Sequence, residues 1–328
     1  MSEKYILGVD GGGTKTHCVL YGIEDNDSYL FTFPTSNHEK LRGGYTQLEK
    51  VIEEMVAIIC SGRSIDVSDI VASCFNLSGI DFPYQHKLIS NMIESTGITN
   101  FILKNDTFAG VKANCDNGYG IAAVNGTGCC IAGINENGDS IQLGGLGEIS
   151  GDIGGAHFMI KASVGAVYDY LYRGGEKTML SKELAKALST TEKLIPERAF
   201  QAFEKSDETA IRKMAIAVYA AADCNDKKAI EILETIGDFY AENIFAVYNK
   251  LGFTSETVPV ALIGTQFIKG ENPAIINRIR SRIEGEGKPF RIVPSTSKPV
   301  IGSVLWAAEL ADFSTADCHR IKMGLLDI

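Results

Sequence analysis

The sequence lacks the features that mark several large classes of protein. Its eight cysteines include no C-x-x-C pair and its five histidines no H-E-x-x-H segment. These absences argue against a zinc site or a disulfide framework and favour buried, reduced thiols. The chain has no apolar run of about 18 residues or more, so we expect no membrane-spanning helix. It also opens without a basic stretch and an apolar signal core, so we expect a cytoplasmic protein.

The chain also carries fewer positive than negative charges. The 31 lysines and arginines are outnumbered by 41 aspartates and glutamates, and the formal net charge is −10. Duplex binding needs a basic surface that releases counterions, so we expect no nucleic-acid partner. A compact phosphate site is still compatible with this charge, because local backbone N–H groups can outweigh it.

The length of 328 residues predicts two domains, because a single hydrophobic core rarely grows this large. The chain opens with an antiparallel meander of three short strands, over 5–10, 16–23 and 29–33. A helix follows. Thr46 is its predicted N-cap, and Glu49 completes a capping box.

Strands then alternate with helices, which predicts an α/β fold with a mixed sheet covered on both faces. The strands span 70–77 and 101–105, and the helices span 85–96 and 107–115. The pattern restarts at Tyr119 with strands over 121–124, 129–134 and 140–143, then a run of helices over 154–251. It closes with strands over 259–263 and 290–293 and helices over 273–284 and 299–310. We therefore predict a duplicated fold with domains over 1–117 and 118–328, and the sequence leaves open whether 312–328 pack back on the first.

The turn Gly11-Gly12-Gly13-Thr14-Lys15-Thr16 predicts a phosphate-binding loop. A Walker A loop needs Gly-Lys-Ser/Thr, but Thr14 precedes Lys15 here. A dinucleotide fingerprint needs glycine where Thr16 stands and a helix after it, whereas the next segment reads as a strand. A β-turn-β is left, in which glycines let backbone N–H groups approach an anion while Thr14 and Lys15 add a hydroxyl and a charge. A tight hairpin turn without a ligand is the alternative.

Two aspartates follow predicted strands. Asp10 ends the first strand. A carboxylate repels a phosphate bound beside it unless a divalent cation lies between the two. We therefore assign Asp10 to Mg²⁺, through water, with a turn-forming role as the alternative. Asp106 lies at the carboxyl end of a predicted parallel strand, where open α/β sheets place their active sites, and it can serve as a base toward a substrate hydroxyl. A capping role for the helix from Thr107 explains the same position equally well.

The second half has glycine-rich segments of its own. Asn125-Gly126-Thr127-Gly128 is the counterpart of the first turn, and the pair suggests an ATP polyphosphate held across an interdomain cleft. The segment 143–155 holds six glycines in 13 residues around Glu148 and Asp152. We expect a ligand loop whose acids bind sugar hydroxyls, with a flexible linker as the alternative. Gly264 ends a later strand, where the backbone can pack against an adenosine.

With these positions assembled, the chain resembles the N-acetylglucosamine kinase family nearly end to end. That family lies in the actin/Hsp70/sugar-kinase superfamily, near the BadF/BadG-type ATPases that activate benzoyl-CoA reductase and 2-hydroxyacyl-CoA dehydratases. The motifs that carry the resemblance span residues 9–16, 36–38, 77–79, 105–106, 126–128, 144–147, 151–152 and 263–264. The pair Asn37-His38 and the segment that ends in Gly151-Asp152 narrow it to this family.

The resemblance implies two ribonuclease-H-like domains around an interdomain cleft, with ATP and Mg²⁺ as cofactors and a sugar as substrate. Asp106 would be the base that activates the sugar 6-hydroxyl. The sugar would contact Asn37, His38, Thr127, Gly145, Leu146 and Asp152, with Ser78 and Gly79 near its 2-substituent. The phosphates would lie against Gly11, Gly12, Gly13, Thr14, Lys15, Thr127 and Gly128. The adenosine would lie against Gly264.

Two departures leave the acceptor sugar open. Leu146 stands where the family has tryptophan, which removes an aromatic wall near the sugar, and Ile153 stands where it has glutamate. We expect a kinase for the 6-hydroxyl of an amino sugar, N-acetylglucosamine first, with glucosamine or N-acetylmuramic acid as alternatives. The oligomeric state is open, with a homodimer as one option.

Two rival functions stand beside this one. The first is an ATPase that activates a redox enzyme through a cluster shared between subunits. Cys129 and Cys130 are adjacent, but strand alternation points one inward and the other outward. The second is a catalytically inactive sugar-binding regulator, against which the retained Asp10, Asp106 and both glycine turns count.

Overall fold

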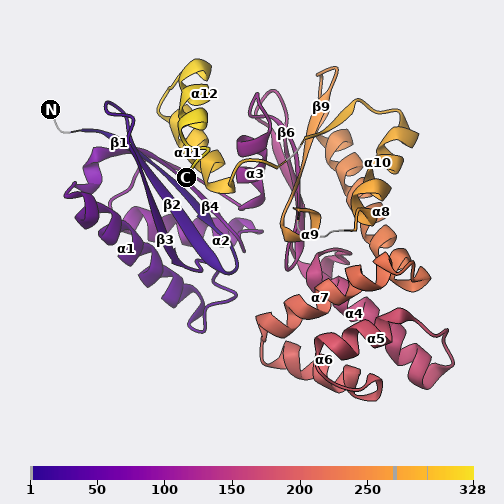
Figure 1. The fold of residues 1–328 in the computed structure, drawn as a ribbon. Coiled ribbons are helices and arrows are strands. Elements are labelled where there is room, and N and C mark those ends of the chain that lie inside the picture. The colour runs from indigo at the N-terminus through magenta and orange to yellow at the C-terminus, as the bar shows by residue number, and fades with distance from the viewer. Residues whose placement is uncertain (1–2, 269–271, 294) are drawn as a thin grey trace.

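A computed structural model describes residues 3–268, 272–293 and 295–328 of the chain. Two five-stranded sheets lie side by side, with helices packed on their faces (Figure 1). The first sheet has the order β3-β2-β1-β4-β5 and the second has β8-β7-β6-β9-β10. These orders are equivalent strand for strand, so the predicted duplication and the α/β class are confirmed.

The first sheet is built as the sequence pattern predicts. Strand β1 pairs antiparallel with β2 and parallel with β4, which in turn pairs parallel with β5. This mixture of one meander and parallel crossovers is the ribonuclease-H-like arrangement. The strands are β1 (Tyr5–Gly11), β2 (Lys15–Gly22), β3 (Ser28–Pro34), β4 (Ile70–Leu77) and β5 (Phe101–Lys104).

The second sheet repeats that design. Strand β6 pairs antiparallel with β7 and parallel with β9, and β9 pairs parallel with β10. The strands are β6 (Gly120–Asn125), β7 (Cys129–Ile134), β8 (Ser140–Gly144), β9 (Val258–Ile263) and β10 (Phe290–Val293). The corresponding ends of β1 and β6 carry the two glycine turns.

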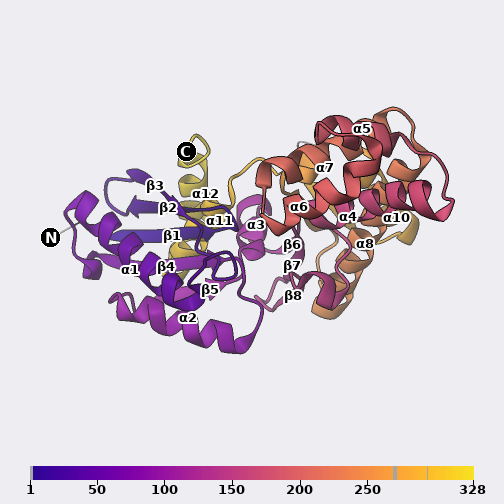
Figure 2. The same cartoon turned by 90° about the horizontal axis from the view of Figure 1, so that it is seen from below.

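Helices account for most of the remaining chain. Those linked to the first sheet are α1 (Gly44–Arg63), α2 (Pro83–Ser95), α3 (Thr107–Asn114), α11 (Pro299–Leu310) and α12 (Thr315–Gly324). The others are α4 (Gly155–Tyr168), α5 (Met179–Ala187), α6 (Ile195–Glu204), α7 (Glu208–Asp223), α8 (Lys227–Leu251), α9 (Thr265–Ile268) and α10 (Ala274–Glu286). Figure 2 shows α4 to α7 gathered far from the first sheet. Within the described ranges, no helix combines the length and apolar character that a bilayer span requires.

Each face of the first sheet has its own hydrophobic core. Leu7 and Leu20 pack with α1 and α2 on one face. On the other face, Ile6 and Val19 pack with Val304 of α11 and with α12. The chain end therefore returns to the first sheet, as Figure 1 shows in yellow. Helix α3 lies between the two sheets and contacts β6, β7 and α11.

The start of α1 differs from the prediction. The helix begins at Gly44 with Gly43 as its N-cap, so Thr46 lies inside the first turn and the predicted capping box is wrong. The side-chain Oε1 of Gln47 accepts a hydrogen bond from the Gly43 N–H at 3.0 Å. This bond satisfies a backbone donor at the helix start, and Thr46 is not needed for it.

Candidate active site

The parallel strands of the first sheet end at one edge, and two predicted carboxylates lie there. Asp10 of β1 pairs with Asn76 of β4, and Asn76 pairs with Lys104 of β5. Asp106 follows Lys104 by two residues, so it lies just beyond the same edge. Asp106 is close enough to Asp10 for its charge to raise the pKa of Asp10. The structure therefore brings together the two acids that the sequence singled out.

Burial and mutual repulsion set the protonation of these acids. Burial, and then the charge of Asp106, raise the pKa of Asp10 to about 8, while Lys15 lowers it. Burial, and then the charge of Asp81, raise the pKa of Asp106 to about 7, while nearby backbone N–H groups lower it. Two buried carboxylates with raised pKa values beside a phosphate loop fit a divalent cation, which would favour their ionised forms.

A magnesium ion would find few protein ligands here, which suits its chemistry. Across the described ranges, no three His, Cys, Asp or Glu side chains gather as a metal site. Mg²⁺ in nucleotide sites typically takes one or two carboxylates and completes its shell with waters and phosphate oxygens. Asp10 can therefore hold the ion through water. This role stays a prediction.

Asp106 stands at the N-cap position of α3, but its side chain does not cap the helix. The neighbouring Asn105 caps instead, because its Oδ1 accepts a hydrogen bond from the Thr107 N–H at 3.0 Å. The Asp106 carboxylate is thus left for another partner. The geometry favours the base over the capping alternative, and the base role itself stays a prediction.

The first glycine turn is tight and open to solvent on one side. The Gly12 N–H donates to the Lys15 carbonyl at 3.0 Å, so this N–H already has a partner inside the turn. Gly13, Thr14 and Lys15 are exposed. The space where a Gly13 side chain would lie is empty. Their backbone and side-chain donors are therefore the ones available to an anion.

The second glycine turn is also closed by a backbone hydrogen bond. The Gly126 N–H donates to the Gly128 carbonyl at 3.0 Å, and Thr127 and Gly128 are exposed. Space is open beside Gly126 and Gly128. The first turn of α4 holds the loop, since the N–H groups of Ala156 and His157 donate to the carbonyls of Gly126 and Thr127 at 2.9 and 3.2 Å.

Gly264 lies where β9 meets this second turn. Its φ of +106° lies in the region that favours glycine. A Cβ there would lie 2.4 Å from the carbonyl oxygen of Asn125, so only glycine fits. The end of β9 is therefore packed directly on the end of β6, beside the predicted adenosine position.

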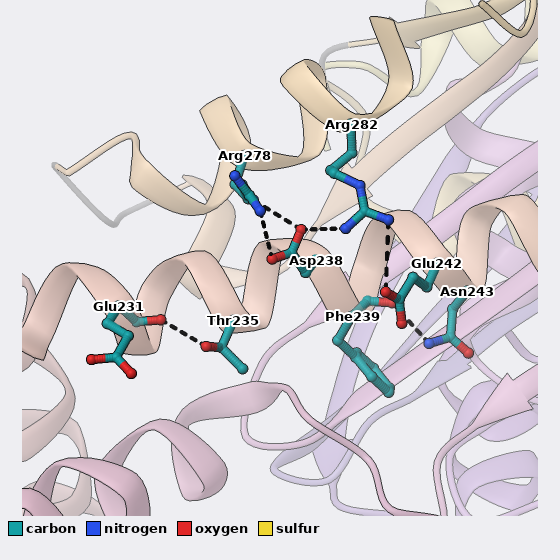
Figure 3. A network of polar contacts seen from close by, with 8 residues as sticks. All are labelled: Glu231, Thr235, Asp238, Phe239, Glu242, Asn243, Arg278 and Arg282. Atoms are coloured by element: carbon teal, nitrogen blue, oxygen red, sulfur yellow. Dashed lines mark hydrogen bonds and ion pairs between the residues drawn. The ribbon is translucent and has the colours of Figure 1, made fainter. Parts of the chain in front are cut away.

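An ion-pair network joins helices α8 and α10 (Figure 3). Asp238 of α8 accepts hydrogen bonds from Arg278 Nε and Nη2 at 2.8 and 3.0 Å and from Arg282 Nη1 at 2.5 Å. Arg282 also lies 3.7 Å from Glu242. These charges lower the pKa of Asp238. The network holds α10 on α8, which supports the second sheet from outside.

The predicted sugar segment is connected to the first glycine turn. Thr35 Oγ1 donates to the Gly12 carbonyl at 2.8 Å and accepts from the Asn37 N–H at 3.0 Å. A Cβ on Gly79 would lie 3.1 Å from Asn37 Oδ1 and from the His38 ring. Asn37, His38 and Gly79 are therefore brought together as the resemblance implied.

Two buried polar atoms in this segment have no partner. Among the described residues, His38 Nδ1 and Ser78 Oγ are buried without a hydrogen bond. His38 also stacks on Tyr45, with ring centroids 4.2 Å apart, and burial lowers its pKa. Orphaned buried donors and acceptors are costly, so their presence fits a polar ligand at this place.

The acids of the glycine-rich loop have partners within the chain. Asp152 Oδ2 accepts hydrogen bonds from the N–H groups of Gly145 and Gly147, both at 2.9 Å, and Oδ1 accepts from Ser150 Oγ at 2.7 Å. Exposed Glu148 forms an ion pair with Lys161 of α4. Asp152 therefore orders the loop, and its predicted contact with the sugar stays a prediction. Half-buried Leu146 precedes the short 3₁₀ turn Gly147–Ser150.

Sequence reasoning missed three side chains at this place. Asn76 is fully buried, and its Nδ2 donates to the Asn105 carbonyl at 3.3 Å. Asp81 Oδ1 accepts from Gln142 Nε2 of β8 at 2.6 Å. The amide of Asn76 inside a mostly apolar strand was a usable signal, whereas nothing in the sequence pairs Asp81 with Gln142. A groove of about 540 Å³ runs along this junction, with a lining that includes Asp81, Phe82, Lys104, Asn105, Phe108 and Gln142.

The two adjacent cysteines of β7 face opposite sides of the sheet as predicted, but both are buried, so neither faces outward to solvent. Cys129 faces the core shared with α4 and α8, and Cys130 lies 3.9 Å from Asn105 Oδ1 on the other face. Helices cover both faces of the sheet, and burial raises the pKa of both thiols. A cluster shared between subunits would need surface thiols. All eight cysteines are described, and the exposed one is Cys224.

Two known sugar kinases are similar to this chain in sequence. The N-acetyl-D-glucosamine kinase of Dictyostelium discoideum is 25% identical over 323 residues, which is 94% of this chain and 98% of that protein. The N-acetylmuramic acid/N-acetylglucosamine kinase of Clostridium acetobutylicum is 24% identical over 232 residues, which is 70% of this chain and 75% of that protein.

A solved structure extends the likeness to the fold. A Chromobacterium violaceum protein, described as a candidate N-acetylglucosamine kinase, superposes with a TM-score of 0.66 at 19% identity. The superposition covers 92% of this chain and 98% of that one. At such identity it establishes the two-domain fold alone.

Residues 7–307 match a single family, and this segment contains both glycine turns and every carboxylate described at the sheet edge. The match spans nearly the whole chain, as the resemblance in the motifs implied. The chain belongs to the BadF/BadG/BcrA/BcrD ATPase family.

Proposed function

We propose that this chain is an ATP-dependent kinase that phosphorylates the 6-hydroxyl of an amino sugar, with N-acetylglucosamine as the first candidate. The observation that carries the proposal is the Asp106 carboxylate, which lies at the edge of parallel strands, does not cap its helix and has a raised pKa. The named activities of the Dictyostelium and Clostridium relatives support the choice of sugar.

In the proposed reaction, Asp106 accepts the proton of the sugar 6-hydroxyl while that oxygen attacks the γ-phosphorus of ATP. The bond from the γ-phosphorus to the bridging oxygen breaks, and ADP leaves. Lys15 and the N–H groups of Gly13 and Thr14 face the phosphates. Magnesium, held through Asp10, would neutralise phosphate charge. Catalysis then depends mainly on positioning and electrostatic stabilisation.

In the proposal, the sugar and the nucleotide bind to different domains. The first domain, over 1–117, would bind the sugar through Asn37, His38 and Ser78. The second domain, built on β6 to β10, would hold the nucleotide through Thr127, Gly128 and Gly264. Closure of one domain on the other would exclude water and so suppress ATP hydrolysis.

The identity of the acceptor depends on the loop after β8. Leu146 offers less surface to a sugar ring than tryptophan, and Ile153 offers no carboxylate. Glucosamine and N-acetylmuramic acid are therefore the alternative acceptors. Their 2- and 3-substituents differ from those of N-acetylglucosamine, so a comparison of the three identifies what the loop recognises.

The proposal is tested by ADP release, measured over hexoses, amino sugars and N-acylated sugars in the presence of Mg²⁺. We expect turnover with at least one amino sugar at millimolar concentration. The 6-deoxy analogue of the best acceptor is the matched control, and it should support no turnover. A chain that turns over none of these sugars, or that accepts the 6-deoxy analogue equally well, would contradict the proposal.

A further inference from the structure

A single carboxylate oxygen links the two sheets next to the proposed base. Asp81 Oδ1 accepts a hydrogen bond from Asn105 Nδ2 at 3.3 Å and another from Gln142 Nε2 at 2.6 Å. Asn105 follows β5 in the first sheet, and Gln142 belongs to β8 in the second. Asp81 therefore connects the residue before Asp106 with the opposite domain.

The backbone of Asp81 is held by hydrogen bonds of its own. The side chain of buried Gln85, in the first turn of α2, accepts hydrogen bonds from the N–H groups of Asp81 and Phe82, both at 2.8 Å. Two bonds to one amide oxygen hold this short segment against the helix. The carboxylate of Asp81 thus projects from a rigid base toward the junction.

The bond from Asn105 determines how that amide is oriented. Because Nδ2 donates to Asp81, Oδ1 faces the opposite way and accepts from the Thr107 N–H at 3.0 Å. The Asn105 carbonyl is held separately by Asn76 Nδ2 at 3.3 Å. In this orientation Asn105 caps α3 and leaves the Asp106 carboxylate uncapped. An Asn105 amide released from Asp81 can rotate, and Asp106 can then take over the cap.

The loop predicted to contact the sugar also packs on this carboxylate. Gly145 has φ +93°, and a Cβ there would lie 3.2 Å from Asp81 Oδ1. The Gly145 N–H is held by Asp152. In this structure the loop and Gln142, both from the second domain, therefore lie against the same carboxylate oxygen.

We propose that Asp81 is a positioning residue, which keeps the Asp106 carboxylate free of the helix cap and aligns it when Gln142 of the second domain docks. This role rests on the proposed kinase function of the same site. Nothing in it requires Asp81 to touch the sugar or ATP. Its loss should therefore act on the rate of phosphoryl transfer and leave ground-state binding nearly unchanged.

The test compares four variants with the wild-type chain on its best sugar acceptor. In Asp81→Ala we expect kcat to fall by about 10- to 100-fold, the range that loss of a hydrogen bond to a charged group produces. The KM values for sugar and ATP should change by less than about threefold. Glu94→Gln, which changes an exposed carboxylate on α2, the helix that follows Asp81, is the matched control and should leave both constants unchanged.

Two variants that change the charges at Asp81 and Gln142 distinguish a positioning role of Asp81 from general damage to the fold. Gln142→Glu places a second carboxylate against Asp81 and should lower kcat as Asp81→Ala does. Adding Asp81→Asn to Gln142→Glu restores a donor and acceptor pair, so the double variant should regain at least about tenfold of the lost kcat. A double variant no better than Gln142→Glu would overturn the proposal. So would an Asp81→Ala chain with unchanged kcat, or one whose loss lies in KM alone.

Failure of the proposed function is a separate result. Wild-type chain that phosphorylates no sugar would overturn the kinase assignment itself, and the role of Asp81 with it. An active wild type whose junction variants behave like Glu94→Gln would overturn the role of Asp81 alone.

Discussion

Replacing Asp106 by asparagine separates the chemical role of this carboxylate from its cost to the fold. The substitution keeps the size of the side chain, removes its ability to ionise and replaces one acceptor oxygen by an N–H donor group. Asn105 caps α3, so the start of the helix should persist in the variant. The variant should therefore fold and bind ATP.

The activity of Asp106→Asn should be low. Loss of a general base lowers kcat by about 10²–10⁴-fold, and ATP affinity should change by less than about threefold. Coupled ADP release measures the first quantity and titration calorimetry the second. Near-full sugar phosphorylation by Asp106→Asn would refute the base assignment. Equal loss of ATP binding would point to misfolding instead.

The stability of the same variant has a predicted sign. The pKa of Asp106 is about 7 in the folded chain against an ordinary value of 3.8. Between these values the folded state keeps the proton that the unfolded state has lost, so stability falls as the pH rises through this window. Above it, the ionised half-buried carboxylate destabilises the fold by about 1–2 kcal/mol, after allowance for solvent screening.

Asp106→Asn should consequently raise the unfolding midpoint by about 2–6 °C at pH 8 without Mg²⁺, and by little at pH 4. Thermal unfolding followed by circular dichroism at the two pH values measures the difference. A midpoint that drops at pH 8, or that shifts equally at both pH values, would refute the electrostatic reasoning. A more stable chain that has lost its activity is the combined result expected.

Three further predictions address other parts of the site. Asp10→Asn should raise the Mg²⁺ concentration needed for half-maximal activity by about tenfold or more, in a Mg²⁺ titration at saturating ATP, and an unchanged requirement would remove Asp10 from the metal site. Gly264→Ala should lower the free energy of unfolding in urea by about 2–4 kcal/mol, because the new Cβ would lie 2.4 Å from the Asn125 carbonyl oxygen. An unchanged free energy of unfolding would show that β9 and β6 can separate there. Leu146→Trp should lower KM for N-acetylglucosamine by about three- to tenfold through ring stacking, and a KM that rises would mean that this side chain does not face the sugar.

The strand pattern was predictable because it depends on local periodicity. Strands β4, β7 and β10 have the predicted bounds, and the restart after Gly118 predicted the repeated strand order of the second sheet. The N-cap at Thr46 was wrong, because Gln47 satisfies the Gly43 N–H from inside the helix. Helix α12 was not predicted, since its apolar positions are few and its position depends on the face of the first sheet.

The candidate site was predictable only where a motif carries it. Asp10 and Asp106 were found because parallel strands end at one edge, which is a topological rule. Asn105 caps α3 in place of Asp106 because of how its side-chain amide is oriented. The hydrogen bond to Asp81 holds that orientation. The contact between Asp81 and Gln142 joins residues 61 positions apart on different sheets, so no local pattern could indicate it.

Phosphorus NMR of the wild-type chain with ATP, Mg²⁺ and N-acetylglucosamine tests the central claim most directly. The account predicts ADP and a phosphomonoester signal coupled to the two protons of the sugar C6 methylene, in equal amounts, with this signal absent for Asp106→Asn. Inorganic phosphate formed at the same rate with and without sugar, and no sugar phosphate, would contradict it.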